Sequence, residues 1–260
     1  MIYTRAVTEG KFLRRPNRFI ADVEINGKIQ TVHVKNTGRC KELLVPGVKV
    51  YLEDFRNVKN LKNPRKTDFD LIAVEKQTKN GKILINMDSQ APNKAVLEWL
   101  NAGKFKNELP PHSEITLIKP EYSLGDSRFD FYIEYKTEIN NSAGEKIFES
   151  HRLLMEVKGV TLEENGHALF PDAPTERGVK HLTELSAFSG SKEYECAVFF
   201  VIQMKGCCSF GANRNTHPEF ADALKNAYEA GVKILAYDCS VTASSMMIES
   251  KIPEILIDYR

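Results

Sequence analysis

Two charged side chains interrupt the otherwise apolar stretch RLLMEVKGV at residues 152–160. Glu156 and Lys158 occupy alternate positions, so in a β-strand both would lie on one face, while Met155 and Val157 would lie on the other. Burying a charge without a partner costs several kcal/mol or more. The pattern therefore indicates a strand with one apolar face and one polar face that could carry chemistry.

A second segment, SRFDFYIEY, can bring a further carboxylate to the same place. Its alternation predicts Phe129, Phe131 and Ile133 on one face, and Arg128, Asp130 and Tyr132 on the opposite face. The intervening INNSAGEK at 139–146 is typical of a hairpin loop. If the hairpin pairs the two strands with their apolar faces together, Asp130 and Glu156 share the other face beside Lys158.

Two carboxylates beside a lysine suit a hard divalent cation such as Mg²⁺ or Mn²⁺, which takes oxygen ligands and completes its shell with water and phosphate oxygens. Asp130 and Glu156 are the candidate metal ligands, and Lys158 could position water or stabilise developing charge. The chemistry would be metal-dependent phosphodiester hydrolysis. Glu-x-Lys also occurs at 9, 134 and 249, so an ordinary charged network on a solvated sheet is the alternative.

The segments before this site have the pattern of a small β-barrel. Five short β-rich runs lie within residues 1–85 and are separated by Gly, Asn and Pro: RFIADVEI, IQTVHVKN, GVKVYLEDF, DFDLIAVEK and KILINMD. Such spacing predicts a five-stranded, OB-like barrel, a form that commonly binds nucleic acid. We expect it to form the first domain.

Residues 86–260 have a mixed pattern that predicts a second, α/β domain. NKAVLEWLNAG has a helical apolar face, and Gly103 can end that helix. Strands are expected near 114–119, 128–136 and 147–158, a helix at 176–189, and then a strand, a helix and a strand. The almost wholly apolar strand CAVFFVIQM predicts a sheet covered on both faces.

The basic residues are concentrated near the N-terminus. Residues 1–66 carry 15 Lys and Arg against 6 Asp and Glu, although the net charge of the chain is only +1. This asymmetry favours contact with a polyanion, the alternative being a solvated basic surface. One set of candidate phosphate contacts is the NTGR turn, with Asn36, Thr37 and Arg39. A second set is Arg14, Arg15 and Arg18, which are expected to precede the first strand.

The segment FPDAPTERGVKHL adds candidates near the end of the Glu156 strand. Thr175 can cap a helix whose first turns carry Arg177, Lys180 and His181, all able to contact a phosphate. Asp172 could add a carboxylate to the site, and Glu98 is a further helical acid. A capped helix with a solvated face, and a surface glutamate, are the corresponding alternatives.

Composition excludes several other classes of protein. Five cysteines without a Cys-x-x-Cys pair favour a reduced, cytoplasmic protein over a disulfide framework. No segment approaches the roughly 20 apolar residues of a membrane span. None of the six histidines has metal-ligand spacing.

Several motifs in order resemble the sugar fermentation stimulation protein family: HVKNTGRCKELLVPG, INMDSQAPN, GDSRFDF, MEVKGVTL, FPDAPTERGVKHLTEL and EFADALKNAYEAGV. The resemblance implies an N-terminal OB-like domain, a restriction-endonuclease-like domain of the PD-(D/E)XK type, and DNA binding. It places Asp130 at the first acidic position, and Glu156 and Lys158 at the Glu-x-Lys. Phe129 departs from the pattern, because it stands where the nuclease motif has proline.

Two functions remain open from the sequence. One is a Mg²⁺- or Mn²⁺-dependent nuclease acting on DNA or RNA, and the other is a DNA-binding regulatory protein that does not cut. The family name also leaves a sugar-processing enzyme open, although no residue specifically supports it. Fold resemblance does not decide between them, since function resides in the site.

Overall fold

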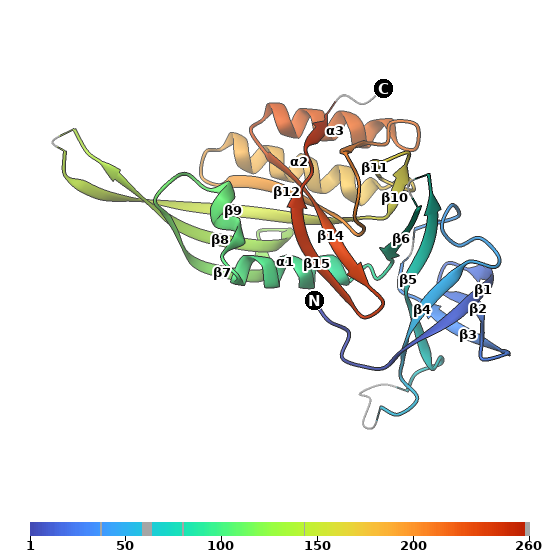
Figure 1. Ribbon diagram of the computed structural model, residues 1–260. Helices are drawn as coiled ribbons and strands as arrows, with labels where there is room; N and C mark the ends of the chain where they lie inside the picture. The colour runs from blue at the N-terminus through green and yellow to red at the C-terminus, as the bar shows by residue number, and fades with distance from the viewer. Residues whose placement is uncertain (37, 59–63, 80, 143, 258–260) are drawn as a thin grey trace.

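A closed β-barrel lies at one end of the molecule, and a sheet covered by helices makes up the rest (Figure 1). The structure is a computed structural model that describes residues 1–36, 38–58, 64–79, 81–142 and 144–257. The fold class predicted from the sequence, a small barrel followed by a mixed sheet flanked by helices, is confirmed.

The barrel has six strands within the described residues, and the prediction of five is wrong. The strand order is β3-β2-β1-β4-β5-β6, and β3 also pairs with β5, which closes the sheet. The strands are β1 (Val7–Asn17), β2 (Ile20–Ile25), β3 (Lys28–Val34), β4 (Lys49–Asp54), β5 (Phe69–Thr78) and β6 (Gly81–Asn86).

The strand that the sequence did not predict is β1, which lies between β2 and β4. Phe12 is its single fully buried side chain, so the segment lacks the apolar alternation of a strand. Gly10 is needed where the interior is tightest, because a Cβ there would lie 2.5 Å from Val23. Arg14 and Arg15 lie on this strand, so the expectation that they precede the first strand is also wrong.

A six-stranded mixed sheet forms the centre of the second domain, in the order β15-β14-β12-β9-β8-β7. The three central strands are parallel and the outer strands are antiparallel. The strands are β7 (Ser113–Leu124), β8 (Ser127–Asn140), β9 (Lys146–Val160), β12 (Glu195–Ile202), β14 (Lys233–Thr242) and β15 (Ser245–Lys251). The expected pairing of β8 with β9 is confirmed, and their far ends form a protruding arm (Figure 1).

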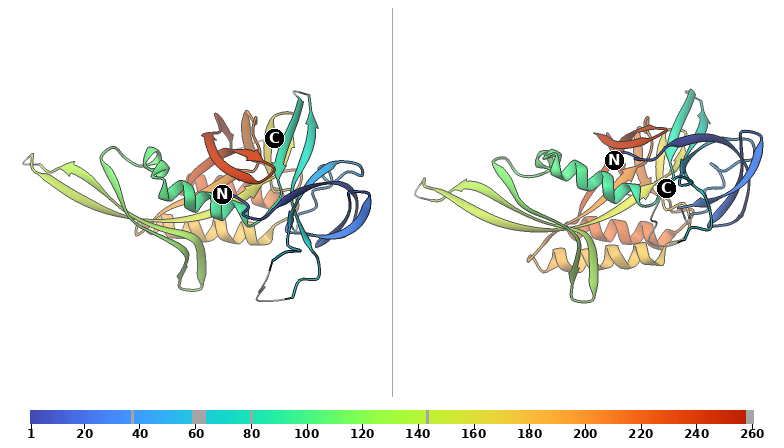
Figure 2. Two further views of the ribbon diagram at one scale, coloured as in Figure 1. Left: turned by 60° about the horizontal axis from the view of Figure 1, so that its bottom comes forward. Right: turned by 90° about the horizontal axis from the view of Figure 1, so that it is seen from below.

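Helices cover both faces of this sheet. Figure 2 shows α1 (Ala91–Asn101) on one face, and α2 (Glu176–Gly190) and α3 (Pro218–Glu229) on the other. Trp99 of α1 packs with Phe131 and Leu153, whereas Leu182 of α2 packs in the core that contains Leu154. The wholly apolar β12 contributes to both cores, as its sequence predicts.

Shorter elements complete the domain. A one-turn 3₁₀ helix, η1 (Lys104–Glu108), follows α1. A small four-stranded sheet consists of β10 (Leu162–Glu164), β11 (His167–Phe170), β13 (Ser209–Ala212) and β16 (Glu254–Leu256). Strands of three or four residues are too short for a readable alternation, so the sequence did not predict them.

None of the described helices combines the length and the apolar character that crossing a membrane requires.

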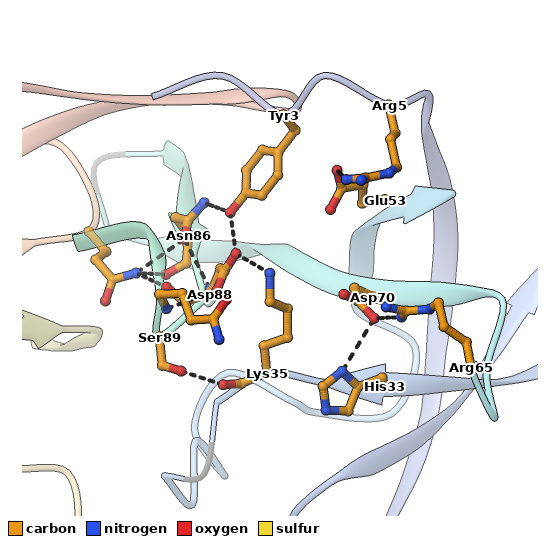
Figure 3. A network of polar contacts seen from close by, with 12 residues as sticks. Tyr3, Arg5, His33, Lys35, Glu53, Arg65, Asp70, Asn86, Asp88 and Ser89 are labelled. Carbon is orange, nitrogen blue, oxygen red and sulfur yellow. Dashed lines mark hydrogen bonds and ion pairs between the residues drawn. The ribbon is translucent and has the colours of Figure 1, made fainter. Parts of the chain in front are cut away.

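A buried polar cluster joins the barrel to the second domain (Figure 3). The side-chain amide of Gln203, directly after β12, donates to the backbone oxygens of Asn86 and Asp88 at 3.1 and 3.2 Å. The fully buried Asp88 carboxylate accepts from Lys35 Nζ at 2.6 Å and from the Tyr3 hydroxyl at 3.3 Å. We call these five residues the junction; they fix the end of β3 and the end of β6 against the large sheet.

Replacing Gln203 by leucine should destabilise the whole protein. The change removes the amide donor from two buried carbonyl oxygens, and each buried polar group left unpaired costs about 1–3 kcal/mol. We expect the free energy of unfolding, measured by urea denaturation, to fall by about 2–4 kcal/mol. Gln77→Leu, at an exposed position of β5, is the matched control and should change it by less than about 0.5 kcal/mol. Equal stability of the two variants would contradict this role for Gln203.

Candidate active site and interdomain cavity

Asp130 lies at a fork where β8 separates from β9. The backbone pairing of the two strands stops at Phe131 and Met155. Beyond it, Asp130 Oδ2 accepts the backbone N–H of Val157 at 2.7 Å, and Oδ1 accepts the side-chain amide of Asn93 on α1 at 2.7 Å. A side chain thus continues the ladder, and the carboxylate is fixed beside the Glu-x-Lys segment.

The fork also breaks the expected alternation of β8. Phe129 packs edge-on against Phe188 of α2, with 5.6 Å between ring centroids, whereas Phe131 lies in the core beneath α1. The prediction that Phe129 and Phe131 share a face is therefore wrong. Its physical reason is local, because Asp130 between them binds the backbone of β9 and Asn93 of α1.

Glu156 is buried, with 4% of its surface exposed, and it is held by two side chains. Lys158 Nζ donates to its Oε1 at 2.6 Å, and the His181 ring bonds the same oxygen through Nδ1. Arg177 Nε donates to the other ring nitrogen, Nε2, at 3.2 Å. Because Nε2 accepts from Arg177, the His181 ring donates to Glu156 through Nδ1.

The two carboxylates respond oppositely to this environment. Burial, with the nearby charge of Glu156 added, raises the pKa of Asp130, although the Val157 and Asn93 hydrogen bonds oppose the rise. Burial acts to raise the pKa of Glu156 too, but the His181 hydrogen bond and the Lys158 charge outweigh it, so this pKa is lowered. Asp130 and Glu156 are thus close enough to interact, and the folded protein favours the neutral form of Asp130 and the charged form of Glu156, each relative to its ordinary pKa.

The donor set fits a hydrated hard cation better than a closed protein cage. Mg²⁺ is usually bound through one or two carboxylates and keeps several waters. The contacts from Lys158 and His181 use Glu156 Oε1, so Oε2 is the oxygen that could turn to a cation. Across the described ranges, no three His, Cys, Asp or Glu side chains are grouped to hold a metal ion. Water or phosphate oxygens would have to complete the shell.

A cavity of about 760 Å³ lies between the two domains, next to this site. Gly159, which directly follows Lys158, lines it together with Thr175. Thr175 caps α2 as predicted, because its hydroxyl accepts the N–H of Gly178 at 3.1 Å. From the barrel, the cavity is lined by Arg15, Asn17, Arg18, Asn36, Gly38, Arg39, Lys41 and Leu44. Predicted phosphate contacts of the barrel therefore lie across one cavity from Gly159 and Thr175, and we call it the interdomain cavity. The predicted contacts of the second domain, Arg177, Lys180 and His181, do not line it.

Arg15 has a structural part in the wall of this cavity. Its guanidinium donates to four backbone oxygens, those of Arg18, Asn36, Gly38 and Arg39, at 2.6–2.8 Å. It therefore ties Asn36, Gly38 and Arg39 to the β1–β2 turn. Its two terminal nitrogens are already used, so its charge is less available to a phosphate than sequence alone suggests.

Three exposed cations remain around the cavity: Arg18, Arg39 and Lys41. None of them forms an ion pair with a described acidic side chain. Arg14, by contrast, pairs with Asp22 at 2.7 Å. Part of the N-terminal positive charge is thus compensated locally, whereas these three cations line the cavity.

The other predicted residues are more dispersed. Lys180 is exposed and pairs with Glu184 at 3.6 Å, and Glu98 pairs with the N-terminal amine at 2.7 Å. Asp172 lines the interdomain cavity and accepts a weak hydrogen bond from the Cys40 thiol at 3.8 Å, so it lies against the barrel. Thr37 lies outside the described residues.

Sequence reasoning missed two residues that shape the site. Asn93 holds Asp130, and nothing in its helical context signalled this. Gln203 was more visible, as a polar residue near the end of the apolar run CAVFFVIQM. Its side-chain oxygen packs so closely over Gly159 that a Cβ there would overlap it, which explains the glycine after the Glu-x-Lys.

These features define a two-domain α+β protein, in which a small barrel is joined to a helix-covered mixed sheet with a forked Glu-x-Lys strand. Two family models match the chain: the SfsA N-terminal OB domain over residues 13–86, and the sugar fermentation stimulation protein RE domain over residues 90–245. The chain belongs to the sugar fermentation stimulation protein family.

Individual relatives agree with this assignment. A sugar fermentation stimulation protein homolog of Desulfitobacterium hafniense strain Y51 is 52% identical over 248 residues, covering 95% of this chain and 94% of the relative. A homolog of Alkaliphilus oremlandii is 46% identical over 256 residues, covering 98% of both chains. The solved structure of Pyrococcus furiosus SfsA in complex with Ca²⁺ matches with a TM-score of 0.75 and 24% identity, covering 98% of this chain and 99% of that one. This last likeness shows the shared fold.

Removing the charge of Asp130 should stabilise the folded protein, whereas removing the charge of Glu156 should destabilise it. The pKa of Asp130 is raised in the folded protein, so its charged form opposes folding above that pKa. Asp130→Asn should therefore raise the urea midpoint at pH 7, and the gain should vanish below the unfolded pKa near 3.8, where aspartate is also neutral.

Glu156→Gln should instead destabilise at pH 7, because the pKa of Glu156 is lowered by partners that stabilise its charge. Breaking a buried pair costs about 3–5 kcal/mol, and the loss should shrink as pH falls through the folded pKa of Glu156. Urea titrations at pH 7 and pH 4 measure both variants. Shifts of the same sign at pH 7 would contradict the opposite environments described above.

Proposed function

We propose that this protein binds DNA and hydrolyses phosphodiester bonds with Mg²⁺ or Mn²⁺ held by Asp130 and Glu156. The observation that supports it best is the fork, which brings two electrostatically coupled carboxylates and Lys158 together beside the interdomain cavity. Only one of the four Glu-x-Lys segments has this setting. RNA is a possible substrate in the same geometry, because a phosphodiester is the group recognised.

Each side chain then has a distinct task. A bound divalent cation would lower the pKa of a ligated water and shield the phosphoryl oxygens. Asp130 and Glu156 hold and orient the cation, while Asn93 and His181 fix those two carboxylates. Lys158, buried except for 13% of its side chain, supplies fixed positive charge to the developing phosphorane.

Two further points support a cation-dependent activity. A family relative, SfsA of Pyrococcus furiosus, is described as a complex with Ca²⁺, a hard cation that prefers oxygen ligands as Mg²⁺ does. The resemblance of the sequence to PD-(D/E)XK nucleases assigns the same three residues.

A second candidate is a DNA-binding protein without catalysis, such as a regulator linked to sugar metabolism. Its supporting observation is that Glu156 already forms an ion pair with Lys158 and a hydrogen bond with His181. A carboxylate satisfied in this way has less need of a metal ion. The two candidates differ in cutting and agree in binding.

Cleavage assays separate these candidates. We expect the wild type to cut DNA in Mn²⁺ or Mg²⁺ but not in chelator, and Glu156→Ala to lose at least about 100-fold in rate, since metal and charge stabilisation supply several kcal/mol. Glu134→Ala removes the acid of another Glu-x-Lys, on β8, and should retain wild-type activity. Single- and double-stranded DNA and RNA should all be tried. Binding without cutting on every substrate would favour the non-catalytic candidate.

Salt dependence tests the predicted phosphate contacts independently of cutting. If Arg39 contacts a phosphate, Arg39→Ala should lower the slope of log K against log salt by about one. Lys28→Ala removes an exposed charge that does not line the interdomain cavity, and it should leave the slope unchanged. Fluorescence anisotropy in chelator measures both slopes. An affinity insensitive to salt would argue against DNA contact at this surface.

A further inference from the structure

We propose that the interdomain cavity receives a single-stranded polynucleotide, and that Phe19 is the surface on which an unpaired base stacks. This rests on the proposed function for the class of ligand, a nucleic acid, and adds which form of it the protein takes. Three features of the structure support it: the burial of Glu156, the volume of the cavity, and the residues of the β1–β2 turn beside it.

The candidate site is too deep for an intact duplex. Glu156 is almost fully buried, and the neighbouring Gly159 forms part of the cavity wall. Gly159 directly follows Lys158, so our proposal has the phosphodiester approach these residues through the cavity. Enzymes with recessed sites act on single strands or extrude nucleotides from the stack, because a paired strand cannot bend into such a pocket.

The cavity has the right size for a short piece of one strand. Its volume of about 760 Å³ lies within the range of roughly 300–1,000 Å³ in which pockets enclose drug-sized ligands, such as one or two nucleotides. The major groove of a duplex is by itself about 12 Å wide, so the whole duplex is much larger than this space. Arg39 and Lys41 at the wall suit the backbone of one strand.

Next to two residues that line the cavity, an exposed aromatic residue stands where a turn does not require one. Arg18 and Phe19 form the two-residue turn between β1 and β2, a position that usually holds glycine or asparagine. Phe19 is 48% exposed, and the Arg18 guanidinium lies 4.9 Å from the centroid of its ring. Asn17 and Arg18, the residues before Phe19, both line the cavity.

This turn is also held in place before any ligand arrives. Asn17 Oδ1 accepts the backbone N–H of Phe19 at 2.9 Å, and Arg15 bonds the Arg18 carbonyl at 2.8 Å. The Phe19 carbonyl accepts the N–H of Val34 at 2.7 Å. A fixed aromatic face beside cations is the arrangement with which single-strand binding proteins stack bases in any sequence.

Binding in chelator tests this inference separately from cleavage. Oligo(dT) and oligo(U) should bind the wild type more tightly than a DNA hairpin duplex of equal length, measured by fluorescence anisotropy at one salt concentration. Alanine in place of a stacking aromatic costs about 1–3 kcal/mol per base, so Phe19→Ala should weaken oligonucleotide binding about 5- to 150-fold. Phe148→Ala, at a 65% exposed position on the β8–β9 arm, is the matched control and should bind as the wild type does.

Further readouts separate stacking from altered folding. Fluorescence of a 2-aminopurine base in the oligonucleotide should be quenched by the wild type and by Phe19→Trp, but not by Phe19→Ala. Phe19→Leu keeps an apolar side chain without a ring and should bind as weakly as Phe19→Ala. Equal affinity for duplex and single strand, or wild-type binding by Phe19→Leu, would overturn the inference. Failure to cut with Mn²⁺ would instead count against the phosphodiesterase alone, since this binding is measured without metal.

Discussion

The hydrogen bonds of the Gln203 amide hold the geometry of the molecule together. One side chain at the end of β12 satisfies the carbonyl oxygens of Asn86 and Asp88, where the barrel ends. Asp88 in turn binds Lys35, which follows β3 and directly precedes Asn36. The end of β3 is therefore positioned against the second domain by buried polar contacts, which hold direction better than an apolar contact does.

The fork at Asp130 shows how a sheet can present charge without a solvated face. Because β8 leaves β9 at this point, a carboxylate takes the place of a backbone partner, and the space between the strands becomes polar. Glu156 is stabilised from the opposite helix layer through His181, while Asp130 is held through Asn93 of α1. Side chains from helices on the two faces of the sheet thus bind the two carboxylates at one fork.

Much of this fold could be predicted from the sequence, because long segments with clear periodicity kept their predicted structure. The β8–β9 hairpin, the capped helix α2 and the apolar β12 are examples. β1 could not be predicted, since Gly10 and its charged residues hide the alternation of a strand. Asp130, Glu156 and Lys158 were identified by type and spacing, whereas Asn93 and Gln203 act through contacts across more than 30 residues that periodicity does not encode.

The number of charged residues in the sequence likewise did not predict how much charge is available to a ligand. The excess of Lys and Arg in the first 66 residues suggested a broad basic track, yet Arg14 pairs with Asp22 and the terminal nitrogens of Arg15 bind backbone oxygens. What matters for a ligand at the interdomain cavity is the smaller set of cations that line it without an acidic partner among the described residues, Arg18, Arg39 and Lys41. Their position could be seen only in the folded barrel.

The junction links the stability of the barrel to the stability of the second domain. A domain boundary normally falls where few contacts cross, and each side can fold alone. Here a cut between β6 and α1 would pass through the buried cluster itself and would separate Gln203 from Asn86 and Lys35 from Asp88. We therefore expect the two architectural domains to unfold as one cooperative unit, in which loosening the barrel also loosens the sheet that bears Glu156.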